Sequence, residues 1–502
     1  MSNSKVLQNT IANFAGQGWG VIISFVLIPI YLKMLGIESF GLIGVYGMLS
    51  SIIGLLDLGI SANITRELAI LSATINKRDI PITLRSFESI YWPLGLMIII
   101  LAIPFAHLIT SYWINPQDVT QKVVQYAVIF MLLEIGVRFP SGLYLGCMYG
   151  LQKQVQINIY NAFFDSFRHL STLLMLIYFS NTIVIYFICQ AVNSLLKTLC
   201  FCFLTWHMIS PKSMFSTPVS LLIIKKSLKF TLAMSGVTIS NLVYSQMDKI
   251  ILSKLLTLEN FGYYSLVLRV TSSMSSLLMH PILLSVNPKM SQLVSVGNEN
   301  DRRKFFHVSC QLITLAVIPI SMIVIYYSYD LMLLWTKNSQ IAHESRYLLS
   351  LLVFASLFPL MGAGPWIIRY AYGKVSLAAL LNVVCAIIIL PLLLFAIKYG
   401  LIGVGITVAV VNIIYFIIIS KMTFKYYFKT ESMNWLFKDI LIPFLMCFVT
   451  VSLFYYLGQK MKTNSYLWIL LTGIIAFVST LAMTKEITDM MKKFYTKRWR
   501  LS

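Results

Sequence analysis

Long apolar runs follow one another along nearly the whole chain, and they restrict the fold more than any other feature. Each run holds about 20 residues, which as a helix crosses roughly 30 Å of hydrocarbon. Only 11% of the 502 residues are charged, whereas a soluble domain carries about a quarter. The sequence therefore predicts an all-α polytopic membrane protein, because helices satisfy their backbone hydrogen bonds internally in lipid.

The runs predict about fourteen transmembrane helices, or twelve to thirteen if the weaker runs fuse. Their approximate limits are 12–34, 41–62, 88–109, 122–145, 156–179, 183–208, 228–253, 261–284, 306–327, 347–368, 375–397, 401–424, 438–457 and 465–484. Grouped by the longer connections, they predict an N-terminal six-helix bundle at 1–208, a cytoplasmic linker at 209–227 and a C-terminal six-helix bundle at 228–424. Residues 425–502 are expected to form two extra helices and a basic, amphipathic cytoplasmic tail.

A short turn motif occurs twice at a constant separation. Five positions of the first copy are identical in residue type to their counterparts in the second, pairing Lys33, Leu35, Glu38, Phe40 and Gly41 with Lys254, Leu256, Glu259, Phe261 and Gly262. This match indicates an internal repeat of about six spans. Six is an even number, so both halves begin on the same side of the membrane. We expect two six-helix bundles related as a parallel repeat around a central cavity.

The net charge of +21 has a topological origin. The basic residues lie in short loops between apolar runs and form no patch or arm, which argues against a nucleic-acid partner. Placing both termini in the cytoplasm puts most of the 39 Lys and Arg residues on the inner side, as the positive-inside rule requires. We therefore expect a multi-pass membrane protein with both termini in the cytoplasm and with surrounding lipids as partners.

Catalytic and nucleotide-binding signatures do not occur in the sequence. There is no Gly-x4-Gly-Lys-Ser/Thr loop, no His-Glu-x-x-His pair and no Gly-rich dinucleotide loop. The seven cysteines lie in or beside apolar runs, where we expect neither disulfides nor a metal site. The sequence thus predicts a protein that is not an enzyme and has no cofactor, while coupling to protons or sodium stays open.

Ionisable residues inside the apolar runs are the candidate functional residues, because each costs roughly 2.5–3.5 kcal/mol at mid-membrane and usually faces a cavity or a partner. The cations expected to bind substrate are Arg138, Arg168, Lys197, Lys249 and Arg269. The residues expected to act in coupling or gating are Asp57, Arg66, Glu134, Asp165 and Asp248.

A purely structural role competes with each of these assignments. Glu134 with Arg138, and Asp165 with Arg168, have the spacing of ion pairs along one helix face. Asp248 is close enough in sequence to neutralise Arg269 across a hairpin, and Lys197 can extend its ammonium group toward water. As a group, however, the cations predict a positive cavity that attracts an anionic headgroup, with an apolar part for a lipid tail. The expected cargo is an amphiphile with phosphate.

Two stretches carry a resemblance to a known family. Leu35-Gly36-Ile37-Glu38-Ser39-Phe40-Gly41, followed by Leu55-Leu56-Asp57-Leu58-Gly59-Ile60-Ser61, resembles the first hairpin of bacterial polysaccharide transporters. Ser245-Gln246-Met247-Asp248-Lys249 and the segment Phe261-Gly262-Tyr263-Tyr264-Ser265 are similar to their seventh span and turn. These transporters are the Wzx-type O-antigen flippases of the MATE-like multidrug/oligosaccharidyl-lipid/polysaccharide (MOP) superfamily.

The resemblance implies a flippase with two bundles and alternating access. It would carry undecaprenyl-diphosphate-linked oligosaccharide repeat units from the cytoplasmic to the periplasmic leaflet, with a polysaccharide polymerase and a chain-length regulator as possible partners. Asp248 and Lys249 match an acidic-basic pair of the family, whereas Leu27, Ile28 and Met48 stand opposite Asp248, Lys249 and Arg269 in the first half. The alternatives are a flippase for lipid II-type or other exopolysaccharide precursors, a multidrug exporter of the superfamily, and, as a different class, a membrane enzyme such as an O-antigen polymerase or a glycosyltransferase.

Overall fold

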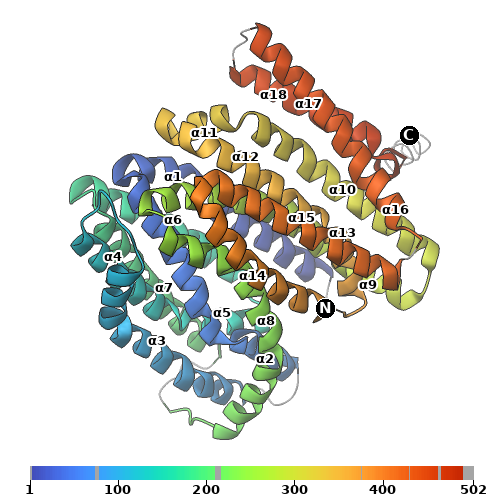
Figure 1. Ribbon diagram of the computed structural model, residues 1–502. Coiled ribbons are helices and arrows are strands. Elements are labelled where there is room, and N and C mark those ends of the chain that lie inside the picture. The colour runs from blue at the N-terminus through green and yellow to red at the C-terminus, as the bar shows by residue number, and fades with distance from the viewer. Residues whose placement is uncertain are drawn as a thin grey trace. The chain divides into compact units, whose positions relative to one another are not determined.

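Every element in the described part of the chain is helical (Figure 1). The computed structural model describes residues 3–73, 79–209, 216–374, 376–428, 430–461 and 465–489. The first half contains α1 (Asn3–Ile53), η1 (Gly54–Asp57), α2 (Ile60–Ala73), α3 (Asp79–Tyr112), α4 (Gln121–Arg138), α5 (Ser141–Gly150), α6 (Gln154–Tyr178), α7 (Ile183–Ile209) and α8 (Leu221–Leu255). Then follow α9 (Leu258–Val296), α10 (Glu299–Tyr326), α11 (Ser328–Thr336), α12 (Ser339–Met361), α13 (Ala363–Ala371), α14 (Ser376–Ala396), η3 (Ile397–Tyr399), α15 (Gly400–Tyr427), α16 (Ser432–Asn434), η4 (Trp435–Leu441), α17 (Ile442–Met461) and α18 (Ser465–Met483).

Ten helical stretches of the described residues are long and apolar enough to cross a membrane. The expected all-α, multi-pass membrane protein is therefore confirmed at this level. Some of the ten contain more than one predicted span: Gly18–Asp57 covers most of the first two, and Ala378–Tyr427 covers two more. The expected total of about fourteen stays a prediction.

Three helix breaks have local causes in the sequence. Gly36 has φ 81°, a left-handed conformation that glycine adopts without a Cβ penalty, and it divides α1 into the two expected segments. Pro140 separates α4 from α5 and cannot donate the backbone hydrogen bond that a continuous helix needs. Gly362 occupies the corresponding break between α12 and α13. Each break lies inside a stretch that is long and apolar enough to cross a membrane.

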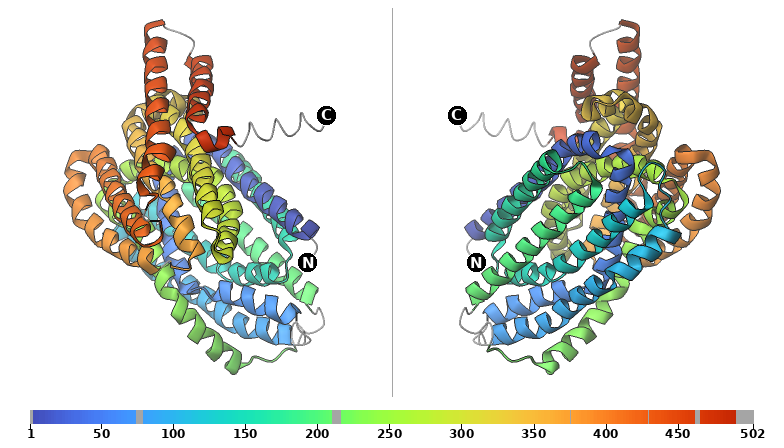
Figure 2. Two further views of the ribbon diagram at one scale, coloured as in Figure 1. Left: turned by 90° about the vertical axis from the view of Figure 1, so that its right-hand side faces the viewer. Right: turned by 90° about the vertical axis from the view of Figure 1, so that its left-hand side faces the viewer.

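The chain forms two compact units, residues 1–265 and 266–502. In the first unit α4 packs against both α3 and α7, and α6 packs against α1, around buried Tyr91, Tyr144 and Trp206. In the second, α15 packs against α12, and α17 and α18 lie side by side as a pair (Figure 2). The expected bundle limits stay a prediction. α8 begins at Leu221, inside the expected linker, while linker residues 210–215 and tail residues 490–502 lie outside the described residues.

The two copies of the turn motif contact each other within the first unit. A Cβ on Gly41 would lie 2.4 Å from the carbonyl oxygen of Leu258, and a Cβ on Gly262 would lie 2.3 Å from that of Ile37. Glycine at both positions thus lets two helix backbones approach closely. The buried carboxylate of Glu38 ties the first copy to the segment before α4, accepting backbone N–H groups of Gln117, Asp118 and Val119 at 2.5, 2.7 and 2.8 Å.

Candidate functional site

A cavity of about 260 Å³ lies inside the first unit and is lined by five of the ten predicted site residues. These are Arg138, Arg168, Lys197, Glu134 and Asp165, and their neighbours in the lining include Tyr46, Ser141, Asn193 and Ser194. Three cations therefore face two carboxylates, which leaves an excess of one positive charge. Five of the charges that are isolated in the sequence are thus brought together around one space.

Helix geometry explains how distant sequence positions meet in this cavity. Glu134 and Arg138 are one turn apart on α4, and Ser194 and Lys197 are about one turn apart on α7. α7 packs against both α4 and α6, the helix that carries Asp165 and Arg168. The apolar faces of α4, α6 and α7 thus supply the packing that holds the ionisable residues around one space.

Glu134 is the most deeply buried charged residue of the cavity, with 2% of its side chain exposed. Arg138 Nε lies 2.9 Å from Glu134 Oε1, and the Ser194 hydroxyl donates to the same oxygen at 2.6 Å. The Arg138 guanidinium also donates to Ser50 Oγ, while 42% of its side chain stays accessible. One face of Arg138 thus satisfies a buried carboxylate and the rest remains available to a ligand.

Asp165 stands between two cations and belongs to both looser pairs of the site. Its Oδ1 lies 3.5 Å from Lys197 Nζ and 4.0 Å from Arg168 Nη2. At such distances the ion pairs are weak, and both cations stay partly accessible. The Arg168 guanidinium also contacts His169 Nε2 at 3.3 Å, and His169 Nδ1 lies 3.0 Å from the Tyr31 hydroxyl. An anion that enters the cavity can therefore replace Asp165 as the partner of Lys197 and Arg168.

Asp57 and Arg66 lie outside this cavity, on η1 and α2. Asp57 accepts hydrogen bonds from the Tyr91 hydroxyl and from the Ser61 hydroxyl, the latter at 2.7 Å. It also accepts the Ser61 backbone N–H at 3.3 Å, as a residue capping α2 would. The structure therefore places Asp57 at a helix junction, and Arg66 is exposed further along α2.

Asp248 and Lys249 lie on α8, also outside the cavity. Asp248 accepts a hydrogen bond from the buried Tyr264 hydroxyl, and Lys249 Nζ donates to the backbone carbonyl of Ser245 at 2.5 Å. Arg269 is exposed on α9 and belongs to the second unit. The gating and substrate-binding roles of these three residues stay predictions.

Two buried acidic clusters were not identified from the sequence. Glu88 on α3 accepts hydrogen bonds from Trp206 Nε1 at 2.7 Å and the Tyr144 hydroxyl at 2.8 Å, and Arg85 lies 2.9 Å away. An acidic residue at the start of an apolar run was the available signal. Arg85 is three residues away on the same helix, whereas Tyr144 and Trp206 come from α5 and α7, and no local spacing identifies these two.

The second cluster ties α10 to the segment before α17. His307 Nδ1 lies 2.5 Å from Asp439 Oδ2, and its Nε2 lies 3.2 Å from Glu431 Oε2. Arg303 Nη1 lies 3.0 Å from the other Glu431 oxygen. Burial acts to raise the pKa of the Glu431 carboxyl, but hydrogen bonds from Asn434 and His307 and the charges of His307 and Arg303 outweigh it, so this pKa lies below its ordinary 4.5.

Several solved structures have a similar fold and are remote in sequence. One described as the lipid II flippase MurJ in an inward closed conformation has a TM-score of 0.72 at 14% identity, covering 97% of this chain and 99% of that one. An inward-facing multidrug resistance MATE family transporter of the MOP superfamily gives 0.68 at 13% identity, with 85% and 95% covered. A MOP superfamily transporter from Pyrococcus furiosus gives 0.56 at 13%, with 84% and 94% covered. These likenesses establish the fold.

Family membership rests on the sequence itself. No curated protein matches the chain. The profile of one family, described as polysaccharide biosynthesis protein, matches residues 6–294, which is more than half of the chain. The match includes both copies of the turn motif and all ten predicted site residues, so the resemblance of these stretches to a polysaccharide family is confirmed. The chain belongs to the polysaccharide biosynthesis protein family.

Proposed function

We propose that this protein is a flippase for undecaprenyl-diphosphate-linked oligosaccharide repeat units of O-antigen or a related surface polysaccharide. It moves them from the cytoplasmic to the periplasmic leaflet of a bacterial inner membrane. The observation that carries the proposal is the cavity of the first unit, with three accessible cations and two carboxylates, in a member of a polysaccharide biosynthesis family. Arginine and lysine together suit a diphosphate, because guanidinium forks pair with its oxygens and the ammonium adds charge.

The size of the cavity supports a headgroup site. Pockets that enclose drug-sized ligands measure about 300–1,000 Å³, so 260 Å³ suits a diphosphate with its first sugar better than a whole oligosaccharide. In this proposal two six-helix bundles alternate access to a central path, and Lys249 and Arg269 add cations along it. Both termini are cytoplasmic, and the protein performs no chemical reaction on its cargo. Coupling to protons or sodium, through Asp165 or Asp248, belongs to the same proposal.

A leaflet assay in a gene-deletion strain tests this function. Deletion should abolish long surface polysaccharide, and the unpolymerised lipid-linked unit should accumulate on the cytoplasmic leaflet. A plasmid copy should restore export, whereas Arg168→Gln with Lys197→Gln should not restore it at equal protein level. Lys304→Gln with Lys485→Gln, two exposed lysines outside the cavity, is the matched control. Accumulation on the periplasmic leaflet would instead indicate a polymerase.

The lipid II-type precursor is the second candidate, favoured by the similarity in fold to a structure described as the lipid II flippase MurJ. Complementation distinguishes the two, because loss of a peptidoglycan precursor flippase is expected to stop growth rather than remove surface polysaccharide. A multidrug exporter is disfavoured, since the family profile describes polysaccharide biosynthesis and the cavity is cationic.

A further inference from the structure

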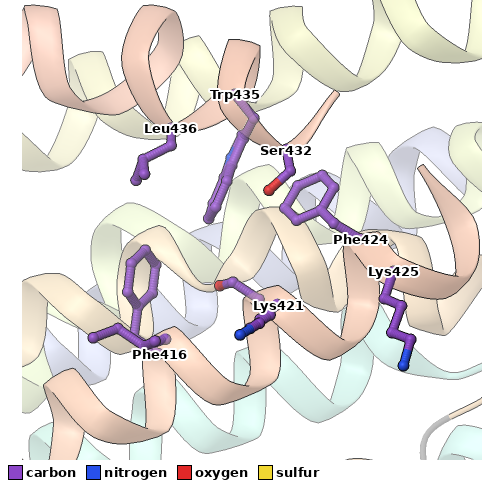
Figure 3. Close-up of a pocket in the computed structure, with 9 residues that line it drawn as sticks. Phe416, Lys421, Phe424, Lys425, Ser432, Trp435 and Leu436 are labelled. Atoms are coloured by element: carbon purple, nitrogen blue, oxygen red, sulfur yellow. The ribbon is translucent and has the colours of Figure 1, made fainter. Parts of the chain in front are cut away.

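A second cavity, of about 460 Å³, lies in the second unit between α15 and the start of the C-terminal helices (Figure 3). Trp435 and Leu436 point into it from one side, and Phe416 and Phe424 point toward them from α15. The Trp435 ring contacts Phe424 at a centroid distance of 4.8 Å and Phe416 at 5.7 Å. The cavity is thus an apolar space where the C-terminal helices meet α15.

The α15 wall of this cavity changes from apolar to cationic along one helix face. Ile417, Lys421 and Lys425 follow each other at one-turn intervals and all line the cavity. At 1.5 Å per residue, the row spans roughly 12 Å from the sec-butyl group of Ile417 to the ammonium end at Lys425. No carboxylate lines the cavity, and within the described residues neither lysine has an ion-pair partner. Glu431, the nearby acid in sequence, is occupied by Arg303 and His307.

The lysines alone do not assign a ligand, because cations in the last turns of a helix also stabilise its free carbonyls. Ser420 supplies a second, independent observation. It lines the cavity with only 7% of its surface exposed, and its buried hydroxyl has no hydrogen-bond partner in the described part of the chain. Its neighbour Thr423 donates to the carbonyl of Ile419 at 2.6 Å, as helical hydroxyls usually do. A buried donor without an acceptor indicates an acceptor outside the chain.

We propose that this cavity binds one anionic glycerophospholipid, such as phosphatidylglycerol. The phosphate lies on Lys421 and Lys425, an ester oxygen accepts the Ser420 hydroxyl, and an acyl chain covers Phe416, Ile417 and Leu436. The order of groups along α15 matches the order in such a lipid: charge, then ester, then hydrocarbon. Basic pockets between membrane helices on the expected cytoplasmic side are the usual sites for such headgroups. The bound lipid joins α15 to the C-terminal helices, independently of the transported cargo.

Lipid titration of the full-length protein in detergent tests the proposal. Native mass spectrometry counts bound dioleoylphosphatidylglycerol, with dioleoylphosphatidylcholine, which has the same tails and no net charge, as the comparison lipid. At about 1 kcal/mol for each basic residue, the Lys421→Gln/Lys425→Gln variant should bind the anionic lipid roughly 30-fold more weakly. The Lys304→Gln/Lys485→Gln variant should bind it as the wild type does. Equal binding of the two lipids, or unchanged binding by the first variant, overturns the proposal.

A second measurement locates the lipid and identifies the occupant. Phosphatidylglycerol with brominated acyl chains should quench wild-type tryptophan fluorescence more than it quenches the fluorescence of Trp435→Phe, because bromine acts only on nearby rings. An equal loss in both proteins places the lipid elsewhere and refutes the site. Displacement of phosphatidylglycerol by an undecaprenyl phosphate would make the cavity part of the cargo path, and this result also overturns the proposal. Failure of the flippase assay would leave both measurements unaffected.

Discussion

The contact between the two turn motifs predicts a specific loss of stability. In Gly41→Ala the new Cβ would lie 2.4 Å from the carbonyl oxygen of Leu258, about 1.0 Å short of the 3.4 Å at which ordinary contact begins. The backbone nitrogen of Gly262 would lie 3.2 Å from the same Cβ, and neither of these two backbone atoms can rotate away. Overpacking of this kind typically costs about 1–3 kcal/mol, which is a factor of roughly 5 to 150 in the equilibrium between the closed and the opened contact.

Gly47→Ala on the same helix is the matched control. A Cβ at Gly47 meets no atom within 4 Å, so this substitution brings only the gain in helix propensity, up to ~1 kcal/mol. Gly41→Ala has the same gain, and therefore the difference between the two variants isolates the cost of the clash. The midpoint of thermal unfolding, measured in detergent at one heating rate, should be roughly 2–12 °C lower for Gly41→Ala than for Gly47→Ala. Equal midpoints would refute the close backbone contact.

The remaining predictions concern carboxylates. Glu38→Gln should destabilise the protein by about 1–3 kcal/mol, because it removes the charge that accepts three backbone N–H groups. Its repeat counterpart Glu259→Gln should cost less than about 1 kcal/mol in the same thermal assay, because the hydrogen bond that Tyr263 donates to Glu259 at 3.2 Å can still be accepted by the amide oxygen of glutamine. Arg138→Gln alone should lower the protein level, because it leaves the buried Glu134 carboxylate without its cation. Adding Glu134→Gln should restore the protein level but not export. Normal export by the double variant would contradict the substrate-binding role of Arg138. The pKa of Glu431 is lower in the folded than in the unfolded protein, so its carboxylate contributes its full stabilisation above pH 4.5 and loses it as the pH falls through the pKa of the folded state. In this acid range the stability of the wild type should therefore drop more than that of Glu431→Gln. Parallel curves of stability against pH for the two proteins would contradict the lowered pKa of Glu431.

Residue patterns predicted the membrane helices and the charges of the first cavity. Long apolar runs leave few alternatives to a helix in lipid, and an ionisable residue inside such a run needs a partner or a cavity. For this reason Glu134, Arg138, Asp165, Arg168 and Lys197 could be chosen before their contacts were known. Their assembly into one site depends on the packing of α4, α6 and α7 and has no local signature.

Contacts between distant segments were beyond prediction for the same reason. The turn motif was visible as a repeat, but nothing in the sequence indicated that Gly41 and Gly262 face the opposite copy. Asp439 and His307 lie 132 positions apart, and only the folded second unit brings them together. The number of membrane spans also depends on whether two helical segments that meet at a break, such as those at Gly36 and Gly362, count as one span or as two. Apolar composition alone does not resolve this.

The contact between the turn motifs is nearly self-complementary. Gly41 faces the residue that corresponds to Ile37 in the second copy, and Gly262, the counterpart of Gly41, faces Ile37 itself. Reciprocal contacts of this kind define the isologous interface of a two-fold symmetric homodimer. The two copies of the motif are thus related inside one polypeptide as the two subunits of such a dimer are, and each glycine makes the contact that its counterpart makes in the other copy.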